Sequence, residues 1–393
     1  MNTLIITSKK MIPPTDGGQF GSLGLIRYLH EIGQSVTLVS FYEGKDYNIA
    51  EKEELKKYVC HIRTVKLIWK NTALNFSLKY PNNVRKYTRR TMYRQLKQLK
   101  KDHEYNLVII DHLQLYEYAK LFPESKIILH THNVESNIWN GYAKNCKGVT
   151  QLFVRRAARM TLEYERNALI TADGVTACSD TDLSMFKKMA PACNAEVMLP
   201  YIKCDRIKKI ADMGETKPQI LYIGNYDWYP NQSAALFLAD ELMPQLRKLV
   251  PGIKLFLVGK NPTVNMKHNA EIYSDIIVTG KVESVDTYIK DADVFVNAVT
   301  QGSGINIKMI EAMGKGIPIV TTSFGARGLG VVHGKEVLIY KTALECAEHI
   351  QSLISNKDTA VTMANHARAH YEHTIVPSQK IRTLFSTDTK SDI

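Results

Sequence analysis

The chain has 393 residues, of which 45% are hydrophobic and 23% charged, and its formal net charge is +12 at pH 7. This length is sufficient for two domains with separate cores, and the apolar content is ordinary for a soluble protein. Its apolar runs are far shorter than the ~20 residues that a membrane-spanning helix needs. Residues 1–11 are not expected to be a secretory signal, because Lys9 and Lys10 directly follow a strand-length apolar run.

The cysteines are scattered along the chain, at positions 60, 146, 178, 193, 204 and 346. None forms a Cys-x-x-Cys pair, so the pattern is not that of a disulfide framework or a zinc site. Reduced, structural thiols are typical of a cytosolic protein. We therefore expect a cytoplasmic location.

The amino-terminal segment is predicted to begin an α/β domain. The expected order is strand, loop, helix and strand, over residues 4–7, 13–19, 20–32 and 35–40. The loop contains Gly17 and Gly18, for which two interpretations stay open. They could admit an anion to the backbone, or they could only allow the chain to turn.

A long basic stretch follows, because residues 56–101 contain no acidic side chain. Aromatic residues are interleaved with the lysines and arginines: Trp69, Phe76, Tyr80, Tyr87 and Tyr93. Charge runs are usually solvated faces, but this length favours an anionic partner, either nucleic acid or an anionic membrane surface. The basic residues expected to face a membrane are Arg85, Lys86, Arg89 and Arg90.

Two histidines follow a predicted buried strand. Residues 107–111 and 126–129 are predicted strands, and His130 and His132 come directly after the second. The carboxyl ends of strands in an open parallel sheet are where ligands bind. A histidine at a strand end is either a hydrogen-bonded structural group or part of a site, and the spacing does not decide between His130 and His132.

A domain boundary is predicted near residue 200. A helix over 151–169 and a last strand over 174–180 complete the first domain, and residues 190–212 then lack regular periodicity. The second half alternates five strands with helices, which predicts a doubly wound parallel sheet. The strands are marked by Leu221, Leu255, Ile276, Val294 and Ile317. Residues 361–393 are expected to form a terminal helix.

The most informative stretch of the second half is residues 301–322. A Gly302-Ser303-Gly304 loop separates a predicted strand from a helix that carries Lys308 and Glu311 on one face. The free amide groups at the start of that helix attract a phosphate, Lys308 adds a positive charge, and Glu311 can accept two ribose hydroxyls. This combination indicates a pocket for a nucleotide diphosphate. The alternative is an ordinary loop before a solvated helix.

Two further segments partly match the patterns of a metal site and of a nicotinamide site. Asp291-Ala292-Asp293 has metal-binding spacing, yet it immediately precedes a buried strand, where acidic residues commonly end a helix or turn. The segment 224–227 follows a strand but lacks the Gly-x-Gly-x-x-Gly spacing of nicotinamide binding. We expect neither a metal nor a cofactor.

Residues 218–345 resemble the carboxyl-terminal half of a retaining family 4 glycosyltransferase of the GT-B fold. The segments that carry the resemblance, in order and spacing, are 221–231, 257–262, 278–282, 302–322 and 324–329. The amino-terminal half resembles the family more loosely, through Gly17-Gly18 and residues 130–135. The resemblance implies an α/β chain of two doubly wound, Rossmann-like parallel-sheet domains facing across a cleft. The expected divisions are 1–200 for the acceptor, 201–372 for the nucleotide sugar, and a helix at 373–393 that crosses back.

The resemblance also implies residue roles. It assigns catalysis to His132, which matches the family's histidine beneath the donor sugar, and to Lys308 and Glu311. Gly17 and Gly18 match the loop that borders the acceptor and the leaving diphosphate. The implied donor and nucleotide contacts are Gly224, Asn225, Gly259, Lys260, Gly280, Val282, Gly302, Ser303, Gly304, Ile305 and Asn306.

The chain departs from the family at two places. Ser303 occupies the position of the first glutamate of the usual pair, within a Gly-Ser-Gly variant that resembles one branch of the family. The loop 225–228 also lacks the arginine and lysine with which many members hold the diphosphate. Lys308 and the helix N-terminus are therefore expected to carry the charge instead, and the donor sugar stays open.

We predict a metal-independent hexosyltransferase that moves a sugar from a nucleotide-diphosphate sugar to a glycan or lipid-linked acceptor, with retention of configuration. The expected setting is cell-surface polysaccharide or glycoconjugate synthesis, at the inner face of the cell membrane. One alternative is a nucleotide-sugar 2-epimerase of the same fold, which needs acid–base carboxylates. The other is a basic nucleic-acid-binding protein, although the aromatic residues of 56–101 fit no recognition module.

Overall fold

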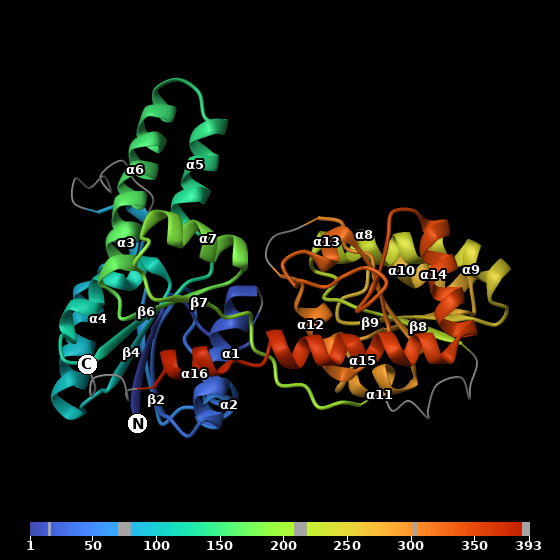
Figure 1. The fold of residues 1–393 in the computed structure, drawn as a ribbon, viewed down its shortest axis with the longest axis horizontal. Coiled ribbons are helices and arrows are strands. Elements are labelled where there is room, and N and C mark those ends of the chain that lie inside the picture. Colours follow the sequence, from blue (N-terminus) through green and yellow to red (C-terminus); the bar gives the residue numbers. More distant parts are fainter. Residues whose placement is uncertain (15–16, 70–79, 208–217, 302–304, 387–393) are drawn as a thin grey trace. The chain divides into compact units, whose positions relative to one another are not determined.

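In the computed structural model, the described residues are 1–14, 17–69, 80–207, 218–301 and 305–386. The chain forms two compact units (Figure 1). The first unit comprises Met1–Tyr201 and Pro377–Ile393, and the second comprises Ile202–Val376. Each unit is a parallel sheet with helices packed against it, which confirms the predicted fold of two Rossmann-like sheets.

The first unit contains a seven-stranded parallel sheet in the order β3-β2-β1-β4-β5-β6-β7. Its strands are β1 (Asn2–Thr7), β2 (Ser35–Tyr42), β3 (His61–Lys66), β4 (Leu107–Asp111), β5 (Lys126–His130), β6 (Gly174–Ala177) and β7 (Ala195–Val197). The register pairs Thr7 with Asp111, Asp111 with His130, and His130 with Thr176. A row of polar residues therefore lies at the carboxyl ends of four adjacent strands.

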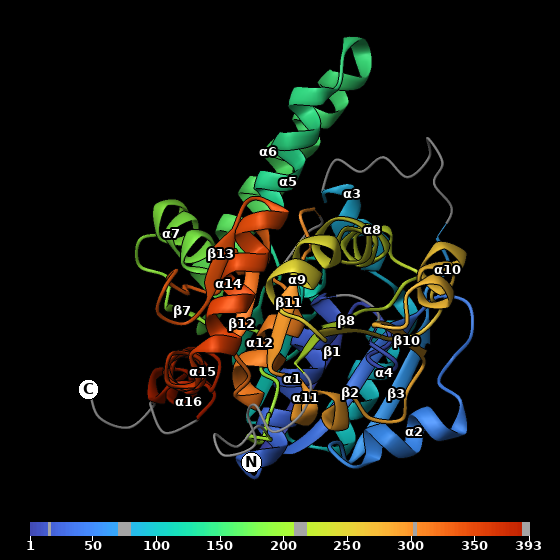
Figure 2. The ribbon, with the colours of Figure 1, turned by 90° about the vertical axis from the view of Figure 1, so that its right-hand side faces the viewer.

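The helices of this unit are α1 (Gly17–Glu31), α2 (Ile49–Lys56), α3 (Asn82–Tyr87), α4 (Arg90–Asp102), the 3₁₀ helix η2 (Leu113–Leu121), α5 (Glu135–Asn145), α6 (Gly148–Thr171), α7 (Asp180–Met189) and α16 (Gln379–Leu384). Helices α5 and α6 lie side by side as a hairpin that projects away from the sheet in both views (Figures 1 and 2).

The second unit contains a six-stranded parallel sheet in the order β10-β9-β8-β11-β12-β13. Its strands are β8 (Gln219–Ile223), β9 (Lys254–Val258), β10 (Ile276–Gly280), β11 (Val294–Asn297), β12 (Ile319–Thr322) and β13 (Leu338–Tyr340). Its helices are α8 (Tyr229–Phe237), the π-helix η4 (Leu238–Leu242), α9 (Met243–Leu249), α10 (Val264–Ile272), α11 (Asp286–Asp291), α12 (Ile307–Lys315), α13 (Ser323–Ala326), α14 (Ala343–Ser355) and α15 (Lys357–Thr374).

Each unit has its own hydrophobic core. The residues of β4 and β11 are buried throughout, as expected for central strands of a parallel sheet that is covered on both faces. Among the described residues, no helix combines the length and the apolar character needed to cross a bilayer.

Several predicted boundaries are wrong. Helix α1 begins at Gly17, so the two glycines form its first turn and do not lie in a loop before it. The strand at 174–177 is not the last of its unit, because the short β7 pairs beyond it. The described part of the predicted terminal helix, up to residue 386, is two helices, since Pro377 interrupts the chain and Ser378 caps α16 through the amide of Ile381. Residues 387–393 of that prediction lie outside the described residues.

Candidate functional site

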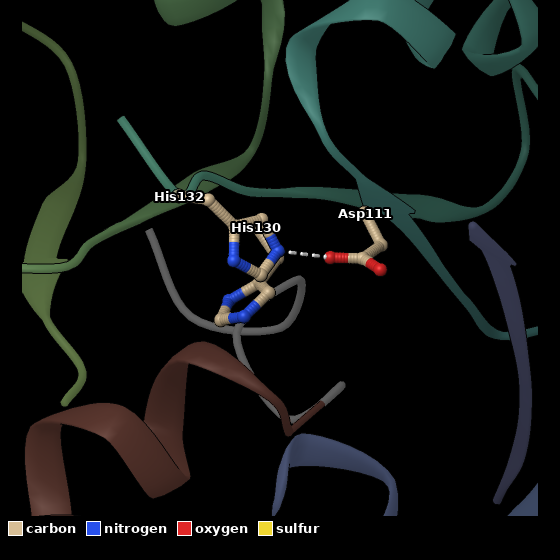
Figure 3. Close-up of side chains that lie close together, drawn as sticks. All are labelled: Asp111, His130 and His132. Carbon is tan, nitrogen blue, oxygen red and sulfur yellow. Dashed lines mark hydrogen bonds and ion pairs between the residues drawn. The ribbon is translucent and has the colours of Figure 1, made fainter. Parts of the chain in front are cut away.

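Asp111 is the centre of a hydrogen-bond network at the carboxyl edge of the first sheet. Its Oδ1 accepts a hydrogen bond of 2.6 Å from Nε2 of His132 (Figure 3), and its Oδ2 accepts one of 2.7 Å from the hydroxyl of Ser22. Nδ1 of His112 lies 3.5 Å from the same Oδ1. Asp111 is fully buried, so these donors supply the solvation that water would give an exposed carboxylate.

The position of this network follows from the strand order. After β1 the chain continues to β2 on one side, while β4 lies on the other side of β1. Ligands of open α/β sheets bind at such a switch point, beyond the carboxyl ends of the strands. Helix α1 follows β1 and brings Ser22 to this edge, where the Ser22 hydroxyl oxygen also lies 3.0 Å from the carbonyl oxygen of Gly18.

Asp111 is the negatively charged group of the network, and it acts on the pKa of the neighbouring histidines. Burial opposes ionisation of Asp111, but His112 and His132 together hold its pKa well below the usual range. Burial disfavours a charged His112, yet the Asp111 carboxylate raises the pKa of that ring. Burial and the neighbouring His112 lower the pKa of His132, whose ring centroid lies 4.0 Å from that of His112. His132 is therefore a neutral ring that donates from Nε2 and keeps Nδ1 as an acceptor.

The structure gives His130 a different environment from His132. Nδ1 of His130 lies 2.6 Å from the hydroxyl of Thr176, and the residue is only 3% exposed. Burial, reinforced by His132, lowers its pKa to about 3. His130 is thus a neutral, inward-facing group of the sheet. His132 follows the strand and carries the network described above.

Asp111, His130 and His132 also form a group with metal-ligand chemistry, since their ligand atoms all lie within 4.8 Å of one another (Figure 3). A metal there would have to displace the direct His132–Asp111 hydrogen bond. That bond already uses one potential ligand atom from each of the two residues. The arrangement therefore suits an oriented imidazole better than a metal centre.

The second candidate site is at the start of α12, where Lys308 is held in a polar niche. Its Nζ donates to Oδ1 of Asn231 at 2.8 Å and to the hydroxyl of Tyr222 at 3.0 Å. Nζ also lies 4.3 Å from the centre of the Tyr222 ring. Burial lowers the pKa of Lys308 to about 7, although nearby Glu311 acts in the opposite direction. An anion bound beside Nζ would favour the charged form.

Glu311 follows Lys308 by one helical turn and is partly buried. Burial raises its pKa, Lys315 and Lys308 oppose that shift, and Asp286 adds to it. Lys315 is itself paired with Asp286. Glu311 is therefore a partly buried carboxyl group with charged neighbours of both signs, and its oxygens can accept hydrogen bonds.

The loop after β8 supports the Lys308 niche. The side-chain amide of Asn231 donates to the carbonyl of Asn225 at 2.8 Å, and the Tyr222 hydroxyl donates to Oδ1 of Asn231 at 2.9 Å. The carbonyl of Lys260 accepts from the amide of Tyr226 at 3.1 Å. Asn225 and Lys260 thus shape the loops at this edge of the sheet.

The predicted glycine contacts have structural reasons of their own. Gly259 has a φ of +149°, and a Cβ there would lie 1.7 Å from the carbonyl oxygen of Gly224, so the two strand-end backbones touch. Gly280 has a φ of +71° at the end of β10, and the partly buried Val282 follows it. Ile305 and Asn306 are partly buried at the start of α12. The residues 302–304 lie outside the described part of the chain.

Lys86 and Arg89, among the four basic residues predicted to face a membrane, interact with other parts of the protein itself. Lys86 forms an ion pair of 2.9 Å with Glu43, a partner that lies outside the acid-free run. The Arg89 guanidinium lies 4.9 Å from the centre of the Trp69 ring, and its Nε donates to the carbonyl of Lys86 at 2.8 Å. Arg85 and Arg90 belong to α3 and α4. These contacts weaken the assignment of this region as the membrane surface.

Several residues of the two sites were not predicted from the sequence. These are Asp111, Ser22 and His112 in the first unit, and Tyr222 and Asn231, the partners of Lys308, in the second. A polar residue that ends a wholly apolar strand is the sequence signal that could have identified Asp111.

The second unit also contains a cavity of about 630 Å³ at the carboxyl ends of β11 and β12. Its lining includes Tyr229, Gln232, Thr300, Thr322, Phe324 and Tyr340.

The Asp291-Ala292-Asp293 segment, which has metal-binding spacing, has a structural role. Asp291 is the last residue of α11, and Oδ2 of the buried Asp293 accepts a 2.9 Å hydrogen bond from the amide of Gln219 at the start of β8. The two carboxylates thus serve a helix end and a strand start.

Comparison with known proteins finds a family match for part of the second unit. Residues 217–356 match the protein family described as Glycosyl transferases group 1. The chain is 22% identical to an uncharacterized 44.6 kDa protein in the cps region of Klebsiella pneumoniae, over 90% of this chain and 91% of that protein. It is 24% identical over 216 residues to a GDP-mannose-dependent alpha-(1-6)-phosphatidylinositol monomannoside mannosyltransferase of Mycobacterium tuberculosis. That match covers 49% of this chain and 55% of the mycobacterial enzyme.

The fold has a counterpart among solved structures. HepE of Anabaena, in a complex with UDP, has a TM-score of 0.61 to this chain at 15% sequence identity. The match covers 98% of this chain and 97% of that one. The family match covers residues 217–356, which lie in the second unit, and the HepE match, at 15% identity, concerns the fold, which is that of GT-B glycosyltransferases.

Proposed function

We propose that this chain is a retaining glycosyltransferase that transfers a hexosyl group from a nucleotide-diphosphate sugar to a glycan or lipid-linked acceptor. The observation that carries the proposal is Lys308, a partly neutral lysine held by Asn231 and Tyr222 at the start of a helix. Such a niche favours binding of a diphosphate. The family match of this unit, and the UDP complex of HepE, support the same chemistry.

In this proposal, catalysis consists of positioning the substrates and stabilising the charge of the leaving nucleotide diphosphate. Lys308 and the amide groups at the start of α12 face the diphosphate, and Glu311 accepts the ribose hydroxyls. His132, oriented by Asp111, shapes the site for the transferred sugar, and the first turn of α1 at Gly17 and Gly18 borders the acceptor. No step requires a metal or a cofactor.

The proposed setting is cell-surface polysaccharide synthesis by a cytoplasmic enzyme that associates peripherally with the membrane. The Klebsiella relative is named for the cps region, and the mycobacterial relative for a phosphatidylinositol monomannoside. Both names fit a glycan or lipid-linked acceptor. A lipid-linked acceptor would place the reaction at a bilayer surface.

Glu311 gives a first test of the nucleotide site. If Glu311 holds the ribose by charge-assisted hydrogen bonds, Glu311→Gln should weaken binding of the nucleoside diphosphate by about 1.5–3 kcal/mol for each bond lost. Titration calorimetry measures this change, and Glu283→Gln, at an exposed position of the same unit, is the matched control. Equal affinities of the two variants would remove Glu311 from the site.

The proposed function is tested most directly by a ligand screen. UDP-, GDP- and ADP-sugars should be compared by thermal shift, because a ligand at ~100 times its Kd stabilises the folded state by roughly 2.7 kcal/mol. We expect one nucleotide class to raise the melting temperature clearly. The stabilising sugar nucleotide is then incubated without acceptor and followed by NMR. Conversion to its 2-epimer would replace the transferase proposal with the epimerase alternative, and absence of any stabilisation would contradict both.

A further inference from the structure

The α5–α6 hairpin carries an apolar tip exposed to solvent. Tyr142, near the end of α5, is 58% exposed, and Leu152 and Phe153, in the second turn of α6, are 66% and 58% exposed. Ile138 lies one turn before Tyr142 and is 38% exposed. Tyr142 and Leu152 are close in sequence to the turn that joins the helices. That turn is at the end of the hairpin that projects away from the sheet (Figures 1 and 2). A patch of this kind usually marks an interaction site.

The same hairpin is strongly basic. No acidic residue occurs from 136 to 162, whereas that stretch contains Lys144, Lys147, Arg155, Arg156 and Arg159. Lys144 and Lys147 are exposed next to the turn, and Arg155 and Arg159 are exposed on α6. Arg159 lies 3.9 Å from Glu163, which is outside the acid-free stretch. The tip thus combines apolar side chains with positive charge and no negative charge.

We propose that the tip of the α5–α6 hairpin docks on an anionic lipid bilayer. Leu152, Phe153 and Tyr142 enter the headgroup region, and the flanking lysines and arginines contact lipid phosphates. This combination is the one that interfacial membrane binding requires, because apolar burial and attraction to anionic lipid act together. Aromatic side chains such as Tyr142 favour the level of the headgroups.

Two other occupants fit the surface less well. The phosphates of a nucleic acid would attract the basic residues, but Leu152 and Phe153 would stay in water. A second copy of this chain would bring two positively charged tips together without acidic partners, and this costs energy. Charge complementarity therefore favours the bilayer.

This inference deepens the proposed function, on which it rests only for its biological purpose: it supplies a surface by which a peripheral enzyme reaches a lipid-linked acceptor. It also assigns docking to a region other than Arg85–Arg90, where Lys86 and Arg89 interact with other parts of the protein. Vesicle binding requires neither a nucleotide nor turnover. The two proposals can therefore fail separately.

The test is co-sedimentation of the full chain with vesicles of phosphatidylcholine alone, and with equimolar phosphatidylcholine and phosphatidylglycerol. The parental chain should bind the anionic vesicles, and binding should fall when salt rises from about 0.1 M to about 1 M, which shortens the Debye length from ~10 to ~3 Å. Leu152→Ser/Phe153→Ser should lower the partition coefficient by about tenfold, because two apolar side chains no longer leave water. Lys144→Gln/Lys147→Gln should also lower it.

A matched control is available in the same unit. Ile49 and Ile170 are 82% and 61% exposed, and Ile170 lies on α6 at the end away from the tip. Ile49→Ser/Ile170→Ser should bind vesicles as the parental chain does, and melting curves should show all variants folded. Parental-level binding by both tip variants, or by the parental chain to neutral vesicles alone, would overturn the proposal. So would a tip-dependent gel shift with DNA, or a tip-dependent dimer in sedimentation velocity, without vesicle binding.

Discussion

Replacing Lys308 with methionine should lower kcat by about 10²–10³-fold, the usual cost of removing one group that stabilises charge in a transition state. Methionine keeps most of the volume but cannot donate to a diphosphate. Folding should be little affected, because Tyr222 and Asn231 still bond to each other at 2.9 Å. Steady-state kinetics with the donor identified by thermal shift measures the effect.

Lys267→Met is the matched control for this substitution, since Lys267 is an exposed lysine on α10 of the same unit. It should retain most of the parental kcat. If the Lys308→Met enzyme were as active as this control, another group would stabilise the charge of the leaving diphosphate.

The low pKa of Lys308, about 7, adds a pH signature to the same residue. Above pH 7 the Lys308 ammonium group of the free protein loses a proton. A bound diphosphate raises the pKa of Lys308, so binding is accompanied by uptake of a proton. Affinity for the nucleoside diphosphate should therefore fall as pH rises from about 7.5 to 9.5, by up to about tenfold per unit. Calorimetry in buffers of different ionisation enthalpy measures the proton uptake. Uptake that persists unchanged in Lys308→Met would assign it to another group.

Lys308 also affects the stability of the free protein. Its folded pKa is below the ordinary value of ~10.4 for an unfolded lysine, so the unfolded chain binds the extra proton between about pH 7 and 10. The contribution of Lys308 to stability should therefore become more favourable as pH rises through that range.

Local spacing was enough to predict which residues share a helix face. Lys308 and Glu311 are one turn apart, and the helical period alone places them together. Their partners could not be predicted in this way. Tyr222 and Asn231 are 86 and 77 residues from Lys308, and the β8–α8 connection brings them to it. Such contacts depend on strand order, which periodicity does not reveal.

The network in the first unit shows the same limit. The sequence indicated that His130 and His132 follow a strand, but the register of β1, β4, β5 and β6 decides what they meet. In the sequence, Asp111 is only the last residue of an apolar run. Its position beside His130 follows from the pairing of β4 with β5. The distinction between a structural His130 and an oriented His132 follows from that pairing.

The two acid-free stretches could not be distinguished from composition alone. In residues 56–101, the side chains of Met92, Leu96 and Leu99 are in the core, and Tyr87 and Tyr93 pack against it. In residues 136–162, Leu152 and Phe153 are exposed. Only tertiary packing distinguishes the first stretch, whose apolar side chains are in the core, from the second, whose apolar side chains are exposed.

His132→Ala should reduce kcat by about 10²-fold or more, while binding of the free nucleoside diphosphate stays unchanged. The physical reason is that Lys308 and Glu311, the proposed nucleotide-binding residues, lie in the other unit, whereas His132 is oriented at the carboxyl edge of the first sheet. His103→Ala, an exposed histidine of the same unit, is the control and should keep parental activity. Equal losses of turnover and nucleotide affinity would make His132 a structural residue.

Asp111→Asn tests the positioning of His132 separately. Asparagine keeps the size of the side chain but removes the charge that raises the pKa of His112 and fixes the donor of His132. We expect a loss in kcat of about tenfold or more, smaller than that of His132→Ala, because the ring remains but its orientation and proton position are no longer held. Without the carboxylate, the pKa of both His112 and His132 should fall, so the acidic limb of the kcat profile should move to lower pH. A lower kcat with an unmoved pH profile, in a variant of normal melting temperature, would show that Asp111 does not act through the histidines.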